Sequence, residues 1–348
     1  MEYKALLFCF LASIFITPVI KKVAMKIGAV DQPSERKVHA RIMPRLGGLA
    51  IFISFALGFL LFFPESSYAW PVFAGAVVIV ITGVLDDLIQ LSPIYKAGGQ
   101  ILASFIVVLG GVKVEFINLP FGGEFEFGYM SIPITVLWIV GITNAINLVD
   151  GLDGLAAGVS AIALLTISAL AISIGNVFVV YAGLIMFGST LGFLLYNFYP
   201  AKIFMGDTGA MFLGFMISVL SLLGFKNVTF YSFIIPILIL GVPISDTLLA
   251  IVRRRIQKKS WCAPDKSHLH HCLLRLGYSH PQAVLMIYAM SALFSLAALF
   301  FSQATMFGSI MMMVVLLLIV ELIVEMTGLI DQSYRPILNW IKGYRYKR

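Results

Sequence analysis

The stretch at 155–174 reads LAAGVSAIALLTISALAISI and carries no charged side chain. An α-helix needs about 20 apolar residues to cross the hydrocarbon core of a bilayer, so this stretch predicts a membrane-spanning helix. Apolar residues make up 60% of the whole chain, charged residues make up 12%, and the mean hydropathy is +0.99. Soluble domains average about a quarter charged residues. We therefore predict an all-α polytopic membrane protein, with residues 1–348 forming a single integral-membrane domain.

Hydropathy along the sequence predicts about eleven transmembrane helices. The predicted spans are 4–20, 47–63, 70–86, 97–112, 131–147, 155–174, 177–197, 209–225, 230–250, 282–302 and 307–328. The first of them has only Lys4 before it and Lys21 and Lys22 after it. Signal peptides have the opposite order of charge, so we expect a retained anchor.

Basic residues are distributed unevenly between the two sides of the predicted membrane. All 24 Lys and Arg residues except Lys4, Lys113 and Lys226 fall on one side. Cytoplasmic loops are enriched in Lys and Arg, which predicts an external N-terminus and a cytoplasmic C-terminus. The basic residues are split among loops next to apolar spans, which argues against nucleic-acid binding. On the external side, polar and apolar residues alternate around Gly122 and Gly123, which predicts a small β-hairpin near 113–128.

Four polar clusters fall at the ends of predicted spans on the cytoplasmic side. Carboxylate and amide oxygens are the ligands that hard cations prefer, and glycines beside a carboxylate let backbone amides approach a phosphate. The clusters therefore predict an enzyme that handles a divalent metal and phosphates at the cytoplasmic face. They comprise Asp86, Asp87 and Lys96; Asn144, Asn147, Asp150 and Asp153; Asp207 within Phe204-Met205-Gly206-Asp207-Thr208-Gly209; and His268, His270 and His271.

Simpler roles stay open for these clusters. Asp86 and Asp87 could form a solvated pair at the membrane boundary, and Asp207 could cap a helix. The basic run at 253–255 is typical of a cytoplasmic flank. Cysteines at 262 and 272 lie near the histidines, but their spacing matches no familiar zinc pattern.

The motifs resemble those of a known enzyme family. Five linked motifs carry the resemblance, which runs from about residue 15 to 330. They are Asp31-x-Pro33-x-x-Arg36-Lys37-x-His39-x-x-x-x-Pro44-Arg45-Leu46-Gly47-Gly48, Asp86-Asp87-x-x-x-Leu91-x-x-x-x-Lys96, Asn144-Ala-Ile-Asn147-x-x-Asp150-Gly-x-Asp153-Gly, Phe204-Met-Gly-Asp207-Thr-Gly and His268-x-His270-His271. In this order they resemble the polyprenyl-phosphate N-acetylhexosamine-1-phosphate transferases. The first motif is similar to the branch that transfers GlcNAc-1-phosphate from UDP-GlcNAc to undecaprenyl phosphate.

The resemblance implies a multi-pass enzyme of the bacterial plasma membrane with a cytoplasmic active site. It would start the synthesis of teichoic acid or a related envelope glycan, with Mg²⁺ as its ion and Mn²⁺ as a substitute. Its partners would be UDP-GlcNAc, undecaprenyl phosphate and membrane lipid, and a homodimer is one alternative for its oligomeric state. The implied residues are Asp86, Asp87, His270 and His271 for catalysis; Arg45, Lys96, Asn144, Asp150, Asp153 and His268 for substrate binding; and Asp207 and Asn147 for the metal.

Two other functions stay open from the sequence. The phospho-MurNAc-pentapeptide transferases share most of these motifs, although the residues around Arg36, His39 and Arg45 argue against that reading. An ion-coupled transporter would carry ionisable residues within its spans, and Glu321 and Glu325 are such residues. The sequence offers no role for these two glutamates.

Overall fold

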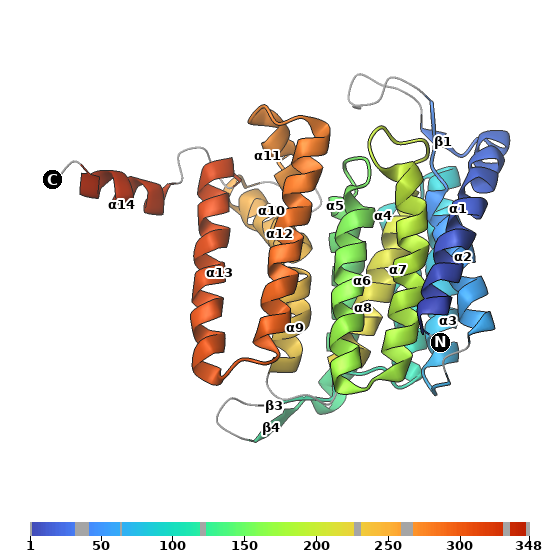
Figure 1. The fold of residues 1–348 in the computed structure, drawn as a ribbon, viewed down its shortest axis with the longest axis horizontal. Coiled ribbons are helices and arrows are strands. Elements are labelled where there is room, and N and C mark those ends of the chain that lie inside the picture. Colours follow the sequence, from blue (N-terminus) through green and yellow to red (C-terminus); the bar gives the residue numbers. More distant parts are fainter. Residues whose placement is uncertain are drawn as a thin grey trace.

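The protein is a bundle of roughly parallel and antiparallel helices (Figure 1). The structure is a computed structural model, and it describes residues 2–31, 42–62, 65–118, 123–225, 231–258, 267–329 and 335–345. The described helices are α1 Glu2–Ile27, α2 Gly47–Leu61, α3 Ala69–Ile89, α4 Pro93–Leu109, α5 Ser131–Val149, α6 Leu155–Ile174, α7 Val177–Asn197, α8 Gly206–Phe225, α9 Tyr231–Ile239, α10 Gly241–Ile256, α11 Leu269–Arg275, α12 His280–Phe301, α13 Met306–Thr327 and α14 Pro336–Arg345.

Within the described ranges, 8 helices are long and apolar enough to cross a membrane, and α2 and α4 are shorter apolar helices. This confirms an all-α polytopic membrane protein. The predicted span at 230–250 is wrong as a continuous helix, because α9 ends at Ile239 and α10 begins at Gly241. Pro243 explains the break: proline has no N–H to donate to the carbonyl four residues earlier, and its ring collides with that carbonyl.

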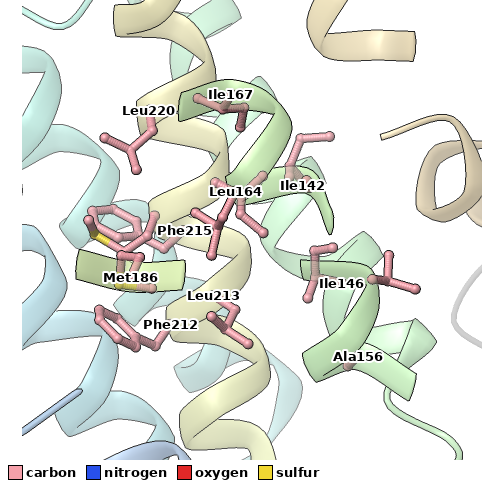
Figure 2. Packing of buried hydrophobic residues seen from close by; sticks show 14 of the residues in the cluster. Ile142, Ile146, Ala156, Leu164, Ile167, Met186, Phe212, Leu213, Phe215 and Leu220 are labelled. Atoms are coloured by element: carbon pink, nitrogen blue, oxygen red, sulfur yellow. The ribbon is translucent and has the colours of Figure 1, made fainter. Parts of the chain in front are cut away.

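Helix α8 lies at the centre of the bundle. Of the residues in its most apolar 18-residue stretch, 94% are buried, compared with 17% in the corresponding stretch of α13. Figure 2 shows its side chains Phe212, Leu213 and Phe215 among apolar residues of α5, α6 and α7. Because neighbouring helices enclose α8 on all sides, they fix the position of its first turn, which carries the Asp207 motif.

Small residues let the first helix pack tightly against α7. A side chain at Gly188 or Gly192 would collide with the backbone carbonyls of Leu6 and Phe10 on α1. Small residues at helix contacts are the usual means of close packing inside membranes, where helix association gains little from the hydrophobic effect. The first helix is thus an integral part of the bundle.

Two short strand pairs lie outside the helices. Strands β3 (Phe116–Asn118) and β4 (Glu124–Glu126) pair antiparallel, which confirms the predicted hairpin. The second pair, β1 (Val30–Asp31) with β2 (Met43–Pro44), was not predicted. Figure 1 shows the N-terminus and the β3–β4 hairpin at one end of the bundle, and β1, α11 and α14 toward the other. This arrangement agrees with the alternation of loops predicted from the sequence.

Candidate active site

Asp87 connects the end of α3 to the start of α8. Its Oδ1 accepts a hydrogen bond from the backbone N–H of Asp207 at 3.0 Å, and its Oδ2 accepts from the N–H and the hydroxyl of Thr208 at 3.0 and 2.6 Å. The first N–H groups of a helix have no partner within the helix and carry partial positive charge, so a buried carboxylate satisfies them well. Gly206 has a φ of +72°, and a side chain there would collide with the Asp87 carboxylate. Asp87 therefore fixes the backbone that carries Asp207.

Asp86 and Asp207 share a lysine. Lys96 Nζ donates to Asp207 Oδ1 at 2.7 Å and to Asp86 Oδ2 at 3.1 Å. The side chains of Lys96 and Asp207 are 19% and 21% exposed, so a charged ligand can approach them. The predicted spans 70–86 and 97–112 leave Lys96 in the connection between them, whereas the structure places it in the first turn of α4. Pro93 begins this helix at a position where its missing N–H costs nothing.

Arg45 faces the same carboxylates from another segment of the chain. Its guanidinium lies 3.8 Å from Asp87 Oδ1, 3.7 Å from Asp207 Oδ2 and 3.7 Å from Asp31 Oδ1. Backbone hydrogen bonds hold Arg45 there, since segment 44–48 pairs with segment 204–205. A side chain at Gly48 would collide with the backbone of Gly209, so the two glycine-containing motifs are in direct contact.

The oxygen ligands around Asp207 fit a magnesium ion. Asn147, near the end of α5, lies beside the Asp207 side chain, and the carboxyl groups of Asp86 and Asp207 are close enough to share the Lys96 ammonium. In the described part of the chain, no group of three or more His, Cys, Asp or Glu side chains is arranged to hold a metal. Mg²⁺ usually binds one or two carboxylates and completes its shell with waters and substrate phosphates. Asp207 and Asn147 match this requirement.

The loop between α5 and α6 holds two further carboxylates. Burial, together with the nearby charges of Asp207 and Asp87, raises the pKa of Asp150 to about 7, and the charge of Arg45 opposes this shift. The carboxylate of Asp153 accepts a hydrogen bond from the backbone N–H of Ala201 at 2.9 Å. Asp153 thus binds the loop that follows α7, in addition to any contact with a substrate.

The three histidines of the fourth motif lie on or beside a short helix. His270 and His271 belong to α11 and His268 precedes it, where the sequence suggested only a loop. His268 and His270 are buried, and a side chain at Gly151 would collide with the His270 ring. Burial, together with the charge of His271, lowers the pKa of His270 to about 3, and the charge of Asp246 opposes this shift. His270 is therefore neutral at physiological pH and packs against the loop that carries Asp150.

Asp246 on α10 is a site residue that sequence reasoning missed. Its Oδ2 lies 2.9 Å from His268 Nδ1, and its Oδ1 accepts from the backbone N–H of Leu269 at 2.9 Å. One buried carboxylate therefore orients the His268 ring and caps the start of α11. The signal in the sequence was an acidic residue inside a predicted span, at 230–250.

Two more polar residues were missed. His280 Nε2 accepts from the backbone N–H of Asp153 at 2.9 Å, and its ring lies 4.7 Å from that of Tyr199. Gln100 on α4 accepts from Asn144 Nδ2 at 2.7 Å. Asn144 was predicted to bind substrate, and in this structure it connects α4 to α5.

The structure thus brings all four polar clusters, together with Arg45, to one end of the bundle. The sequence motif also includes Pro33, Arg36, Lys37 and His39, which lie outside the described residues. The roles of the assembled residues remain predictions, but their proximity is a property of the fold.

Comparison with known proteins agrees with the motifs. The family described as Glycosyl transferase family 4 matches residues 69–225. A Bacillus subtilis protein named "Probable undecaprenyl-phosphate N-acetylglucosaminyl 1-phosphate transferase" is 50% identical over 336 residues, covering 95% of this chain and 94% of the relative. The chain belongs to glycosyl transferase family 4.

Two more distant relatives of the family carry related names. A "Decaprenyl-phosphate N-acetylglucosaminephosphotransferase" of Mycolicibacterium smegmatis is 38% identical, covering 79% of this chain and 75% of the relative. An "Undecaprenyl-phosphate alpha-N-acetylglucosaminyl 1-phosphate transferase" of Thermotoga maritima is 31% identical, covering 82% of this chain and 86% of the relative. These names confirm the predicted resemblance to polyprenyl-phosphate sugar-1-phosphate transferases.

Proposed function

We propose that this protein transfers GlcNAc-1-phosphate from UDP-GlcNAc to undecaprenyl phosphate, which yields undecaprenyl-diphosphate-GlcNAc and UMP. The reaction takes place at the cytoplasmic face of the bacterial plasma membrane and begins the synthesis of teichoic acid or a related envelope glycan. The observation that carries the proposal is the convergence of Asp86, Lys96, Asp207 and Arg45 at one partly exposed site. The similarity to the Bacillus subtilis relative, which covers 95% of the chain, supports it.

The assembled charges suit a reaction between two phosphates. Lys96 and Arg45 supply positive charge where the acceptor phosphate and the donor pyrophosphate must meet, which reduces the repulsion between these anions. Asp207 and Asn147 would hold Mg²⁺, which when bound neutralises charge on the donor pyrophosphate. Asp87 positions Asp207 through the backbone, so we assign it a positioning role in addition to any contact with the acceptor phosphate.

The donor binds on the side of the site formed by the α5–α6 loop and α11. Asp150 and Asp153 lie at this loop, and His270 packs against it. We propose that Asp153 contacts the uracil, while His270 and His271 contact the sugar or its phosphates. A neutral His270 donates or accepts a hydrogen bond without adding charge, whereas Lys96 and Arg45 carry the charge.

The acceptor needs little help to become a nucleophile. A phosphate monoester has a second pKa of about 6, so undecaprenyl phosphate is mostly dianionic at neutral pH. One of its oxygens attacks the sugar-bearing phosphorus of UDP-GlcNAc, the bond from that phosphorus to the UMP oxygen breaks, and UMP leaves. We therefore favour direct transfer over a covalent intermediate on Asp86 or Asp87.

A donor panel tests the proposal. Purified full-length protein is incubated with undecaprenyl phosphate, Mg²⁺ and, separately, UDP-GlcNAc, other UDP-hexosamines and UDP-MurNAc-pentapeptide, and the lipid product is weighed by mass spectrometry. We expect product from UDP-GlcNAc and none from UDP-MurNAc-pentapeptide. Preferential use of the pentapeptide donor would establish the alternative peptidoglycan reaction. Transport by an ion-coupled mechanism would give no lipid-linked product with any donor.

A further inference from the structure

The C-terminal helix α14 leaves the bundle at the end of α13 that lies level with α11. Figure 1 shows it to one side of the end of α13, running away from the other helices. From residue 335 to the end of the sequence, every charged residue is basic: Arg335, Lys342, Arg345, Lys347 and Arg348. The packing of the bundle does not explain why the chain ends in a separate helix whose charged residues are all basic.

Glu325 fixes the start of α14. Its side chain is fully buried near the end of α13, and its two carboxylate oxygens accept hydrogen bonds from the backbone N–H groups of Ile337 and Leu338 at 2.7 and 2.8 Å. A carboxylate at a helix N-terminus is stabilised by charge-assisted hydrogen bonds and by the helix dipole. The structure thereby gives a role to Glu325, which the sequence left unexplained.

A second contact secures the connection between the two helices. Arg253 of α10 is buried, and its Nη1 donates to the backbone carbonyl of Leu329 at 2.5 Å. The turn after α13 is therefore attached to the same helix, α10, that carries Asp246. Glu325 thus holds the first turn of α14 beside the end of α13, and Arg253 holds the turn that follows α13.

The sequence of α14 is that of an amphipathic helix. Ile337, Trp340, Ile341 and Tyr344 recur in the sequence at spacings of three and four, a pattern that predicts an amphipathic helix. Trp340 is 71% exposed. Helices that lie in the plane of a membrane surface combine such an apolar face with basic residues, and tryptophan is enriched at the level of lipid headgroups.

The position of α14 favours a lipid surface over a protein partner. Only 17% of the most apolar stretch of α13 is buried within this chain, which leaves most of this apolar helix exposed for contact with lipid chains. A helix that extends sideways from the end of α13 must lie beside the lipid headgroups there. Its excess of positive charge complements the anionic phospholipids of a cytoplasmic leaflet.

We propose that α14 lies in the cytoplasmic headgroup layer and binds anionic phospholipids, with Glu325 holding it in that plane. This inference goes beyond the transferase activity and does not depend on it. The partner is the anionic bilayer surface itself, recognised by apolar side chains that enter the interface and by basic residues that contact lipid phosphates.

Trp340 provides an intrinsic probe. Full-length protein in which the other three tryptophans, Trp70, Trp138 and Trp261, are replaced by Phe is placed in nanodiscs of phosphatidylcholine with or without phosphatidylglycerol. Brominated lipid chains quench the fluorescence of Trp340 where it contacts the membrane, and iodide quenches it where it contacts water. We expect phosphatidylglycerol to raise bromolipid quenching about twofold, with iodide quenching lowered correspondingly and the effect weakened by salt. If the variant that keeps only Trp340 does not fold, a nitroxide on Asn339→Cys reports the same accessibilities.

Matched charge variants distinguish lipid binding by α14 from a general attraction between the basic protein and anionic lipid. Arg335→Gln/Lys342→Gln removes two charges at α14, while Lys21→Gln/Lys22→Gln removes two from the same end of the bundle at α1. The first variant should lose most of the phosphatidylglycerol effect and the second should keep it. Three results would overturn the proposal. They are strong iodide quenching in both lipid compositions, lipid contact that does not depend on phosphatidylglycerol, and equal loss of the phosphatidylglycerol effect in both variants.

Discussion

Replacing Asp87 with Asn tests whether the link between α3 and α8 positions the site. The Asp87 carboxylate accepts three hydrogen bonds, two from backbone amides and one from the Thr208 hydroxyl. Asn keeps one oxygen and puts an NH₂ group in place of the other, so at least one buried N–H at the start of α8 loses its acceptor.

The expected cost follows from these contacts. An unsatisfied buried donor costs about 1–3 kcal/mol, and loss of the charge at a helix N-terminus adds about 0.3–1 kcal/mol. Asn is neutral, so the variant no longer bears the desolvation cost of a buried carboxylate, and this offsets part of the loss. We therefore expect a net loss of about 2–3 kcal/mol in the free energy of unfolding. Turnover should fall by about 100-fold, because displacing a catalytic group by about 1 Å has an effect of that size.

Thr208→Val isolates one of the three hydrogen bonds. It removes only the hydroxyl and should cost about 1.5–3 kcal/mol, as expected for a bond to a charged group. In the double variant with Asp87→Asn the losses should be less than additive, because both changes remove the same contact. Thr190→Val is the matched control, since its buried hydroxyl bonds only a backbone carbonyl of its own helix.

The assays are the temperature of half-inactivation in detergent and the rate of lipid-linked GlcNAc formation. Asp87 does not position the site if Asp87→Asn inactivates at the wild-type temperature and turns over within about threefold of wild type, a barrier difference of only about 0.65 kcal/mol. Strictly additive losses in the double variant would show that Asp87 and Thr208 act separately.

Three further outcomes are expected. Asp207→Asn should abolish turnover almost completely and weaken the Mg²⁺ dependence while inactivation temperature is retained; substantial activity with unchanged Mg²⁺ titration would reduce Asp207 to a helix cap. The lowered pKa of His270 means that, as pH falls below about 6.5, the unfolded chain binds a proton that the folded protein excludes, so the contribution of this residue to stability should drop by about 1.4 kcal/mol between pH 7.5 and 5.5. The raised pKa of Asp150 acts in the opposite direction over the same range. The difference in stability between wild type and His270→Gln should therefore fall by that amount, and a difference that does not change with pH would contradict the buried neutral histidine. Radiolabelled UMP should not exchange into UDP-GlcNAc without lipid, whereas exchange that Asp86→Asn or Asp87→Asn abolishes would indicate a covalent intermediate.

Much of the architecture was predictable because the bilayer restricts what a chain can do. Spanning segments must be apolar and helical, since backbone groups in lipid have no water to bond. The span predicted at 155–174 coincides with α6, and that at 177–197 with α7. The break at Leu240 was missed because hydropathy averages over a window and does not register one proline's effect on hydrogen bonding.

The sequence by itself determined the fold class, the hairpin and the list of polar motifs, because composition, periodicity and spacing are local properties of the chain. Only the tertiary structure decided which motif contacts which. Asp87 binds the backbone of α8 across 120 positions of sequence, Asp246 orients His268, and Glu325 caps α14. Such pairings depend on how helices far apart in sequence pack together, and a buried carboxylate gives no sign in the sequence of which distant N–H group or ring will satisfy it.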